Sequence, residues 1–231
     1  MPPRIKQHPK TLAREMHSLD PDAWNAEQVT DWTFSLTGGK LRATYAGNPT
    51  AVDWNYNGGV QVETGAILVG RELTQGMAVS LNGVSHALAV AMDHDQPSVN
   101  GIGVGVGIIN ASTFAAATEW MAVVNERDGA TTLTIRDESD AAEFSVGAAV
   151  AQADYNRVSF SGSIIDGLWQ IVRRGSDDDV IGQKNNRFAA FVDLDGQRWW
   201  LALFFVSTAG ADGTVDVTRA ASIGQRAGLF T

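Results

Sequence analysis

The sequence predicts an all-β protein, an antiparallel two-sheet jelly-roll sandwich, and three observations lead to this prediction. Asn-Gly and Asp-Gly pairs are the strongest short-range hairpin signal, because both central residues of a type I′ turn need positive φ. These pairs occur at 57–58, 82–83, 100–101, 128–129, 166–167, 195–196 and 212–213. All 6 prolines lie at or before Pro97, which leaves the rest of the chain free to pair in sheets. A chain of 231 residues with 44% hydrophobic residues can fill the core of one large domain.

Composition excludes several classes of site. Cysteine is absent, so the chain has no disulfide, no thiolate metal site and no cysteine nucleophile. The 4 histidines show no H-E-x-x-H pairing, which argues against a histidine-built metal site. No apolar run reaches the ~18 residues of a membrane span, and the opening MPPRIKQHPK lacks the apolar core of a secretion signal. We therefore expect no cofactor, no bound metal, no membrane contact and no secretion signal.

The first residues form a basic arm on an acidic body. Residues 1–14 contain Arg4, Lys6, Lys10 and Arg14 and no acid, whereas the net charge of the whole chain is −9. We expect residues 1–18 to dock onto an acidic surface of another subunit through these cations, in a homo-oligomer or a larger assembly. Nucleic acid is not an expected partner, because the acidic body would repel it.

Helix is expected only near the start of the chain. Residues 11–19 can form one short helix, and Asp20-Pro21-Asp22 supplies an N-cap and a first-turn proline for a second helix that runs to about residue 29. Residues 19–231 are expected to form a single sandwich domain. The expected strands lie near 32–36, 40–46, 51–56, 59–69, 77–81, 86–92, 101–109, 118–126, 131–136, 142–150, 156–162, 168–174, 187–194, 197–206 and 214–218.

The stretch NGIGVGVGIIN, residues 100–110, alternates glycine with aliphatic residues. A G-x-G-x-x-G phosphate loop would need glycine where Val106 or Ile108 stands, so the spacing favours a strand. Period two sends Ile102, Val104, Val106 and Ile108 to the core and four glycines to the other face. Three occupants could cover that face: aromatic side chains of the facing sheet, a neighbouring subunit's backbone, or a ligand. We expect close packing inside the assembly, and Gly103→Val and Gly105→Val should impair folding or assembly.

A two-residue turn at Asp128-Gly129 predicts a hairpin with a fixed register. It pairs Val124 with Leu133 and Ala122 with Ile135 on a core face. The opposite face, which pairs Asn125 with Thr132 and Met121 with Arg136, is expected to be wet.

A second turn, at Asp195-Gly196, predicts that residues 187–194 pair with residues 197–206. One face of this hairpin is apolar. The other face places Phe191 beside Trp200, and Asp193 beside Arg198. These four side chains form the candidate surface for a sugar ring or an apolar protein partner.

Three acidic clusters are candidates for chemistry. Residues 138–143, ESDAAE, resemble the catalytic strand of laminarinase-type β-glucanases, in which the first and last glutamates are nucleophile and acid/base. Here the residues between the acids are small, and the flanking segments indicate two strands, so we expect a loop and no catalytic residue. Asp93-His94-Asp95 and the run at 177–179 suggest calcium ligands, but neither continues as a known calcium loop, and we interpret both as polar turns.

A family resemblance supports the sandwich. The run SLDPDAWNAEQVTDWTFSLTGGKLRATYAG, residues 18–47, resembles the opening of concanavalin A-like lectin/glucanase sandwiches. TLTIRDESDAAEFSVGA and NRVSFSGSIIDGLWQIVRRG are similar to the central hairpins of the laminin-G-like branch. The resemblance implies a jelly roll of about a dozen strands and permits glycan binding. The whole chain also resembles tailed-phage virion proteins that use this fold.

The leading functional expectation is a non-enzymatic virion protein, a capsid-decoration or head- or tail-fibre subunit that is anchored by its arm and assembled in the cytoplasm. The alternative is a carbohydrate-binding, lectin-like module used for adhesion. A β-glucanase-type glycoside hydrolase comes third.

Overall fold

The structure is a computed structural model of the chain. It describes residues 11–27, 31–47, 64–73, 87–118, 120–128, 130–137, 142–150, 155–163, 168–174, 180–187, 198–207 and 212–226. Within these residues the regular structure is two antiparallel sheets, and the helical elements are the 3-10 turns η1 (Pro21–Ala23) and η3 (Phe114–Ala116). The predicted all-β, two-sheet sandwich is confirmed.

The back sheet has eight strands in the order β13-β12-β11-β6-β15-β4-β3, with β1 paired to β15. Its strands are β1 (Thr11–Met16), β3 (Trp32–Thr37), β4 (Lys40–Tyr45), β6 (Ala87–Asp95), β11 (Tyr155–Ser163), β12 (Leu168–Arg174), β13 (Val180–Arg187) and β15 (Gly213–Arg226). The long β15 accepts two partners along one edge, because β4 pairs with its first half and β1 with its second half.

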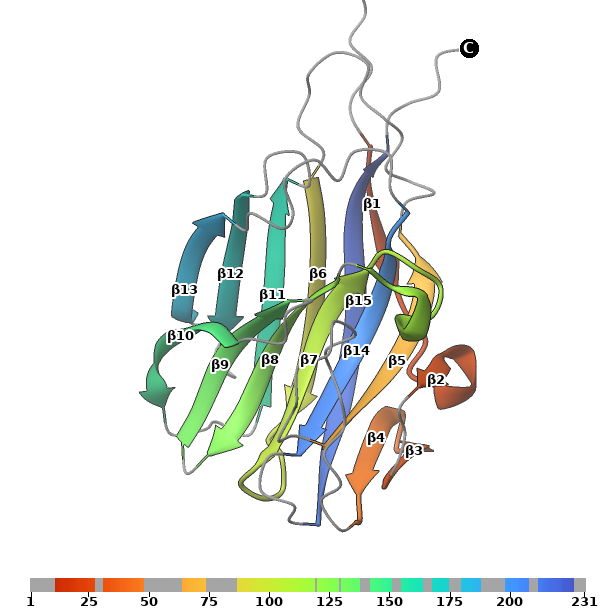
Figure 1. Cartoon of the computed structure of the whole chain (residues 1–231), viewed down its shortest axis with the longest axis vertical. Helices are drawn as coiled ribbons and strands as arrows, with labels where there is room; N and C mark the ends of the chain where they lie inside the picture. The colour runs from red at the N-terminus through yellow and green to blue at the C-terminus, as the bar shows by residue number, and fades with distance from the viewer. Residues whose placement is uncertain are drawn as a thin grey trace, which may run out of the picture.

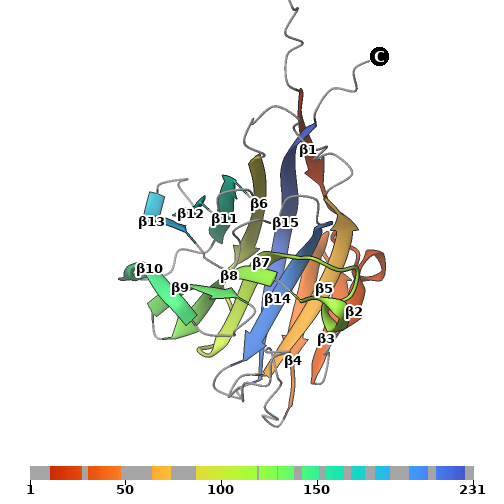
Figure 2. The same cartoon turned by 45° about the horizontal axis from the view of Figure 1, so that its top comes forward.

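The front sheet has seven strands in the order β10-β9-β8-β7-β14-β5-β2, and it lies in front of the back sheet in Figure 1. Its strands are β2 (Asn25–Glu27), β5 (Thr64–Glu72), β7 (Ile102–Ile109), β8 (Trp120–Asp128), β9 (Ala130–Asp137), β10 (Ala142–Val150) and β14 (Trp200–Ser207). Tilting the molecule shows the two sheets as separate layers (Figure 2).

Two apolar cores flank the front sheet. The main core fills the space between the sheets, and strand alternation explains its members: Leu201, Leu203 and Phe205 of β14 point into it. Ala202, Phe204 and Val206 of the same strand point the other way, into a second core on the outer face of the front sheet. A strand that is apolar on both faces is covered on both faces, and this second core positions the candidate site described below.

The tight β3–β4 hairpin follows from two glycines. Gly38 and Gly39 have φ values of 59° and 78°, which are the positive angles that a type I′ turn requires at both central residues. Thr37 and Lys40 pair directly across this turn.

The two predicted N-terminal helices are wrong in different ways. Residues 11–16 form β1, because the second half of β15 offers an open edge, and sheet pairing there overrides local helix preference. The predicted start of the second helix is correct, since the Asp20 side chain accepts a hydrogen bond from the Asp22 N–H and Pro21 follows it. The helix ends after three residues, however, because Trp24 turns to an extended conformation and its indole packs over Gly70.

The hairpin at Gly129 forms in a different register from the predicted one. Val124 pairs with Thr134, and Asn125 with Leu133, one residue away from the prediction. The predicted wet face is also wrong, because every residue from Trp120 to Asn125 is buried. Because both faces of β8 are covered, its apolar pattern does not select between the two registers.

The acidic pattern Asp93-His94-Asp95 belongs to β6, so the polar-turn interpretation is wrong. Alternation sends His94 inward, where its Nε2 lies 2.9 Å from Nδ2 of Asn125 on the opposite sheet. Both aspartates point outward. Asp93 pairs with Arg219 of the neighbouring strand β15, whereas Asp95 pairs with Lys40 of β4, on the far side of β15. Strand β13, which follows the acidic run at 177–179, was not predicted.

Several predictions lie outside the described residues: the strands at 51–56 and 77–81, most of the strand at 187–194, residues 138–141, and the first ten residues of the arm. The strands that flank residues 138–141 are present as β9 and β10, which pair with each other as predicted.

Candidate functional site

The alternating glycines of β7 face the second core. Ile102, Val104, Val106 and Ile108 are fully buried between the sheets, as predicted. On the other face, a Cβ atom added to Gly107 would lie 2.5 Å from Cε2 of Phe204, and one added to Gly105 would lie 2.6 Å from the Val123 carbonyl oxygen. This face is therefore closely packed and covered by protein, as predicted, and the atoms that cover it at Gly105 and Gly107 belong to neighbouring strands of the same sheet.

The space left by the glycines holds a cluster of three aromatic rings. Phe204 and Trp120 stack with centroids 5.5 Å apart, and Phe114 meets both rings edge-on at 6.0 Å and 5.4 Å. All three residues are at most 1% exposed. Edge-to-face and offset-stacked rings at such distances attract one another beyond their area burial. The glycine stripe is thus the floor of an aromatic core.

Residues 110–118 cover this aromatic core, and two sets of hydrogen bonds hold them in place. The two carboxylate oxygens of Glu27, at the end of β2, accept the N–H groups of Phe114 and Ala115 at 3.0 Å each. Asn110 and Thr118 close the segment by exchanging two hydrogen bonds of 2.8 Å and 2.9 Å. A charged acceptor that receives two backbone donors is a strong anchor for a short turn.

Trp200 lies at the rim of the second core, at the start of β14. Its indole is partly exposed and packs against the second core, and Ala111 of the covering segment packs against the same core. Trp200 pairs directly with Ile109 of β7 on one side and with Glu72 of β5 on the other. Its ring is therefore fixed by buried neighbours while part of it meets solvent.

Arg198 lies over the Trp200 ring, with its guanidinium carbon 5.1 Å from the ring centroid. Its Nε donates to Oε1 of Glu72 at 2.8 Å, and its Nη2 donates to Oε2 of the same carboxylate. Glu72 raises the pKa of Arg198, first through these hydrogen bonds and then through its charge. A planar cation is therefore held by a carboxylate and an indole together.

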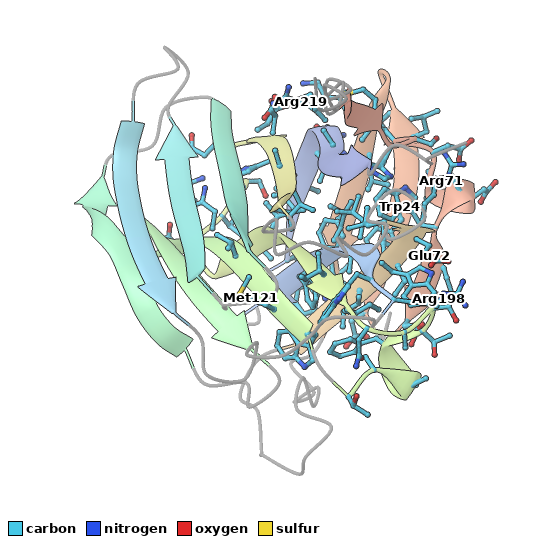
Figure 3. All side chains as sticks on the ribbon, turned by 90° about the horizontal axis from the view of Figure 1, so that it is seen from above. Trp24, Arg71, Glu72, Met121, Arg198 and Arg219 are labelled. Carbon is cyan, nitrogen blue, oxygen red and sulfur yellow. The ribbon has the colours of Figure 1, made fainter. Side chains whose placement is uncertain are left out.

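This cluster of Arg198, Glu72 and Trp200, called the rim site below, is exposed and rigid at once. The side chain of Arg198 is 67% exposed, whereas that of Glu72 is 13% exposed. Among the described residues, Nη1 of Arg198 and Nε1 of Trp200 donate no hydrogen bond. Figure 3 shows Arg198 and Glu72 side by side at one edge of the front sheet, on the same side of the molecule as Arg71 and Trp24. The rim site thus offers donors beside a flat aromatic edge.

The structure keeps two of the four residues predicted for the candidate surface together. Trp200 and Arg198 are neighbours, whereas Phe191 and Asp193 lie outside the described residues. The predicted pairing of residues 187–194 with residues 197–206 is wrong. β14 pairs with β5 along one edge and with β7 along the other, so neither edge is left for a third strand. Glu72 was missed by the sequence reasoning, since its partner Arg198 lies 126 positions further on and no local pattern links them.

The predicted contacts of the arm remain predictions. Arg4, Lys6 and Lys10 lie outside the described residues, and Arg14 pairs through its backbone with Ile223 of the same chain. The second part of the arm is therefore a strand of the back sheet.

No group of three or more His, Asp or Glu side chains that could hold a metal ion occurs in the described part of the chain. In the same part, no helix is long and apolar enough to cross a membrane.

Comparisons with known proteins find likenesses in structure and none in sequence. No family model matches the chain, and no curated protein matches it. Lectin I from Ulex europaeus, solved with the methyl glycoside of α-L-fucose, matches with a TM-score of 0.60 and 10% identity over 93% of this chain and 98% of its own. Arcelin-5, a lectin-like defense protein from Phaseolus vulgaris, matches with a TM-score of 0.60 and 9% identity over 94% of this chain and 100% of its own.

A bacteriophage protein has the same fold. The CBM2 module of the evolved Dit of Lactobacillus casei BL23 phage J-1 matches with a TM-score of 0.60 and 9% identity, over 95% of this chain and 99% of the module. These matches run over nearly the whole of both chains. The chain therefore has the concanavalin A-like jelly-roll fold, as the sequence resemblance implied.

Proposed function

We propose that the chain is a non-enzymatic, lectin-like module that binds carbohydrate at the rim site. The fold supports this proposal, because the proteins that share it from end to end include lectins and a CBM2 module. Fold alone does not specify function, so the proposal depends on the rim site itself. The observation that carries it is the exposed guanidinium of Arg198, held by Glu72 and stacked on Trp200.

The chemistry of the rim site suits a sugar ring. Sugar hydroxyls both donate and accept hydrogen bonds, and the site supplies donors from Arg198 and Trp200 beside acceptor oxygens of Glu72. The indole adds an apolar surface with a polar N–H, a combination that suits a ligand with apolar and polar faces. Because the ion pair and the stacking fix the side chains before a ligand arrives, little side-chain entropy is lost on binding.

A glycan array with the intact chain identifies the sugar, and titrations with that sugar test the site. Trp200→Ala removes the ring and should abolish binding, whereas Trp200→Phe keeps a ring and should retain part of the affinity. Arg198→Lys should weaken binding, because an ammonium cannot donate the paired hydrogen bonds to Glu72. Leu36→Ala is a control on an exposed side chain of the other sheet and should bind as wild type. Binding that survives Trp200→Ala and Arg198→Lys unchanged would place the sugar elsewhere.

A virion subunit anchored by residues 1–18 is the second candidate. The likeness to a module of the Dit of phage J-1 favours it, and a sugar-binding module can also be a part of a virion. On this proposal Arg4, Lys6 and Lys10 contact an acidic neighbouring subunit, and such contacts weaken with salt. Deleting residues 1–10, ahead of β1, should then prevent incorporation into particles while sugar binding remains. Incorporation that is unaffected by this deletion would rule out an anchoring role for the cations.

We also propose that the chain lacks glycosidase activity. Glu143 lies in β10, which pairs with β9, and Glu138 lies outside the described residues, so the structure does not bring the two acids together on one described strand. A retaining glycosidase needs its two carboxyl groups about 5–5.5 Å apart, and the small residues between the two acids in ESDAAE depart from the pattern of the β-glucanase strand.

A further inference from the structure

The rim site lies beside an irregularity in β5. Just beyond the pair of Trp200 with Glu72, the register of the two strands shifts, because β5 contains one residue more than β14 between successive pairs. Such a β-bulge re-aims the side chains around it. Gly70 lies in the bulge, and Trp24 of the main core packs against it so closely that an added Cβ would lie 2.6 Å from Cζ3 of the indole. The bulge is therefore supported from the core side.

Arg71 follows Gly70 and precedes Glu72 in this part of β5. It is exposed, and within the part of the chain that the structure describes it forms no hydrogen bond or ion pair. Consecutive Cα atoms are about 3.8 Å apart, so the long side chain of Arg71 can reach a ligand that lies beside Glu72. Figure 3 shows Arg71, Glu72 and Arg198 on the same side of the molecule. Two cations therefore accompany one carboxylate here.

The unused hydrogen-bonding groups of the rim site are donors. Arginine has five N–H groups, and Glu72 accepts from two of those of Arg198, one on Nε and one on Nη2. The other three, on Nη1 and Nη2, form no hydrogen bond among the described residues, and neither does Nε1 of Trp200. Both carboxylate oxygens of Glu72 already accept from Arg198. A ligand group that only accepts hydrogen bonds therefore fits better than one that must also donate.

We propose that the sugar bound at the rim site is acidic, with a carboxylate that lies against the outer edge of Arg198 and within reach of Arg71. This inference rests on the proposed function and adds the class of sugar. The N–H groups of Nη1 and Nη2 point the same way along one edge of the guanidinium, which matches the two oxygens of a carboxylate. Uronic acids and sialic acids both carry such a group on a sugar ring, and the ring then lies beside the indole of Trp200.

The carboxylate of Glu72 does not prevent this arrangement. Glu72 uses the edge of the guanidinium formed by Nε and Nη2, so the ligand meets the edge formed by Nη1 and Nη2. Each carboxylate is then closer to the positive group than to the other carboxylate. Arg71 adds a second positive charge, so the two cations balance the carboxylates of Glu72 and of the ligand. Because the side chain of Arg198 is 67% exposed, the bound carboxylate keeps part of its hydration and its desolvation costs little.

The test compares sugars that differ only in charge. Trimers of galacturonic acid and of glucuronic acid, and sialyllactose, are titrated calorimetrically into the intact chain, each beside its methyl ester, which keeps the rings and removes the charge. At least one acid should bind about tenfold or more tightly than its ester, because the ester cannot form the charge-assisted pair with Arg198. The affinity of that acid should fall as salt is added, whereas that of the ester should not. Acetate at the same concentration should not compete, because it has no ring to lie beside Trp200.

Two variants test the role of each cation. Arg71→Gln should weaken binding of the acid by about two- to fivefold, the effect of one exposed charge, and leave binding of the ester unchanged. Arg198→Lys keeps the charge but loses the paired N–H groups, so the ratio of the two affinities should fall further. Lys40→Gln is the matched control, since it removes one positive charge from the other sheet, and it should bind both sugars as wild type does.

The outcomes separate this inference from the proposed function. Esters or neutral sugars that bind as tightly as the acids, with binding lost in Trp200→Ala, would overturn the preference for acidic sugars and leave the proposed function standing. No binding of any sugar would overturn both. A preference for the acids that persists unchanged in Arg71→Gln and Arg198→Lys would place the carboxylate elsewhere and overturn the inference.

Discussion

The glycines of β7 allow a quantitative test of how the second core is built. In Gly107→Ala the new Cβ would lie 2.5 Å from Cε2 of Phe204, whereas two carbon atoms are at optimal separation at about 3.5–4.0 Å. It would also meet the Met121 carbonyl oxygen, which belongs to the backbone of β8 and is held in the sheet. Overpacking of a close-packed core costs about 1–3 kcal/mol. Alanine also restricts the unfolded chain more than glycine does, and this offsets about 0.4–1 kcal/mol of the overpacking cost.

Urea unfolding followed by circular dichroism should therefore show that Gly107→Ala lowers the free energy of unfolding by about 1–2 kcal/mol. Gly38→Ala is a contrasting variant, because nothing lies within 4 Å of its Cβ position and any loss of stability there comes from its φ of 59° and not from a clash. In Phe204→Leu/Gly107→Ala the smaller side chain should relieve part of the clash, seen as a coupling energy in the double-mutant cycle. A Gly107→Ala variant as stable as the wild type would refute the close approach of Phe204.

Three further predictions concern other parts of the molecule. Glu27→Gln leaves one backbone donor with a neutral acceptor and the other facing an NH2 group that cannot accept, so hydrogen exchange at Phe114 should become about tenfold faster, a change of about 1.4 kcal/mol. Asp95 raises the pKa of Lys40 above its usual 10.5. The ion pair therefore stabilises the folded protein below pH 10.5, and this stabilisation is lost as the pH rises through the raised pKa. The difference in melting temperature between wild type and Lys40→Met should narrow above pH 10.5. Glu138→Gln and Glu143→Gln should leave a β-glucan assay unchanged, and loss of activity in either would contradict the loop interpretation.

Local signals in the sequence predicted most strands but not their distant partners. The alternation in residues 101–109 specified β7, its buried face and its crowded glycine face, because side-chain direction in a strand depends only on neighbouring positions. β1 was mistaken for a helix, since its partner β15 lies about 200 positions further on, as the contact between His17 and Ser222 illustrates. Pairing over such a separation leaves no pattern in either segment alone.

The candidate site shows the same limit. The turn signal at Asp195-Gly196 suggested a local partner for β14, but the strand inserts between β5 and β7, and both come from much earlier in the chain. Trp200 and Arg198 could be identified because they are two residues apart in the sequence, at the start of β14 and just before it. Glu72, which fixes Arg198, could be found only after the order of the strands was known.

The proposed sugar site depends on the ring of Trp200 and on the guanidinium that it supports. The most direct measurement is a calorimetric titration of wild type, Trp200→Ala and Trp200→Phe with the sugar that the wild type selects on a glycan array. Sugar binding at the rim site predicts measurable affinity for the wild type, a weaker constant for Trp200→Phe and none for Trp200→Ala, with all three proteins folded by circular dichroism. An array that shows no bound glycan, or a folded Trp200→Ala that binds as tightly as the wild type, would contradict it.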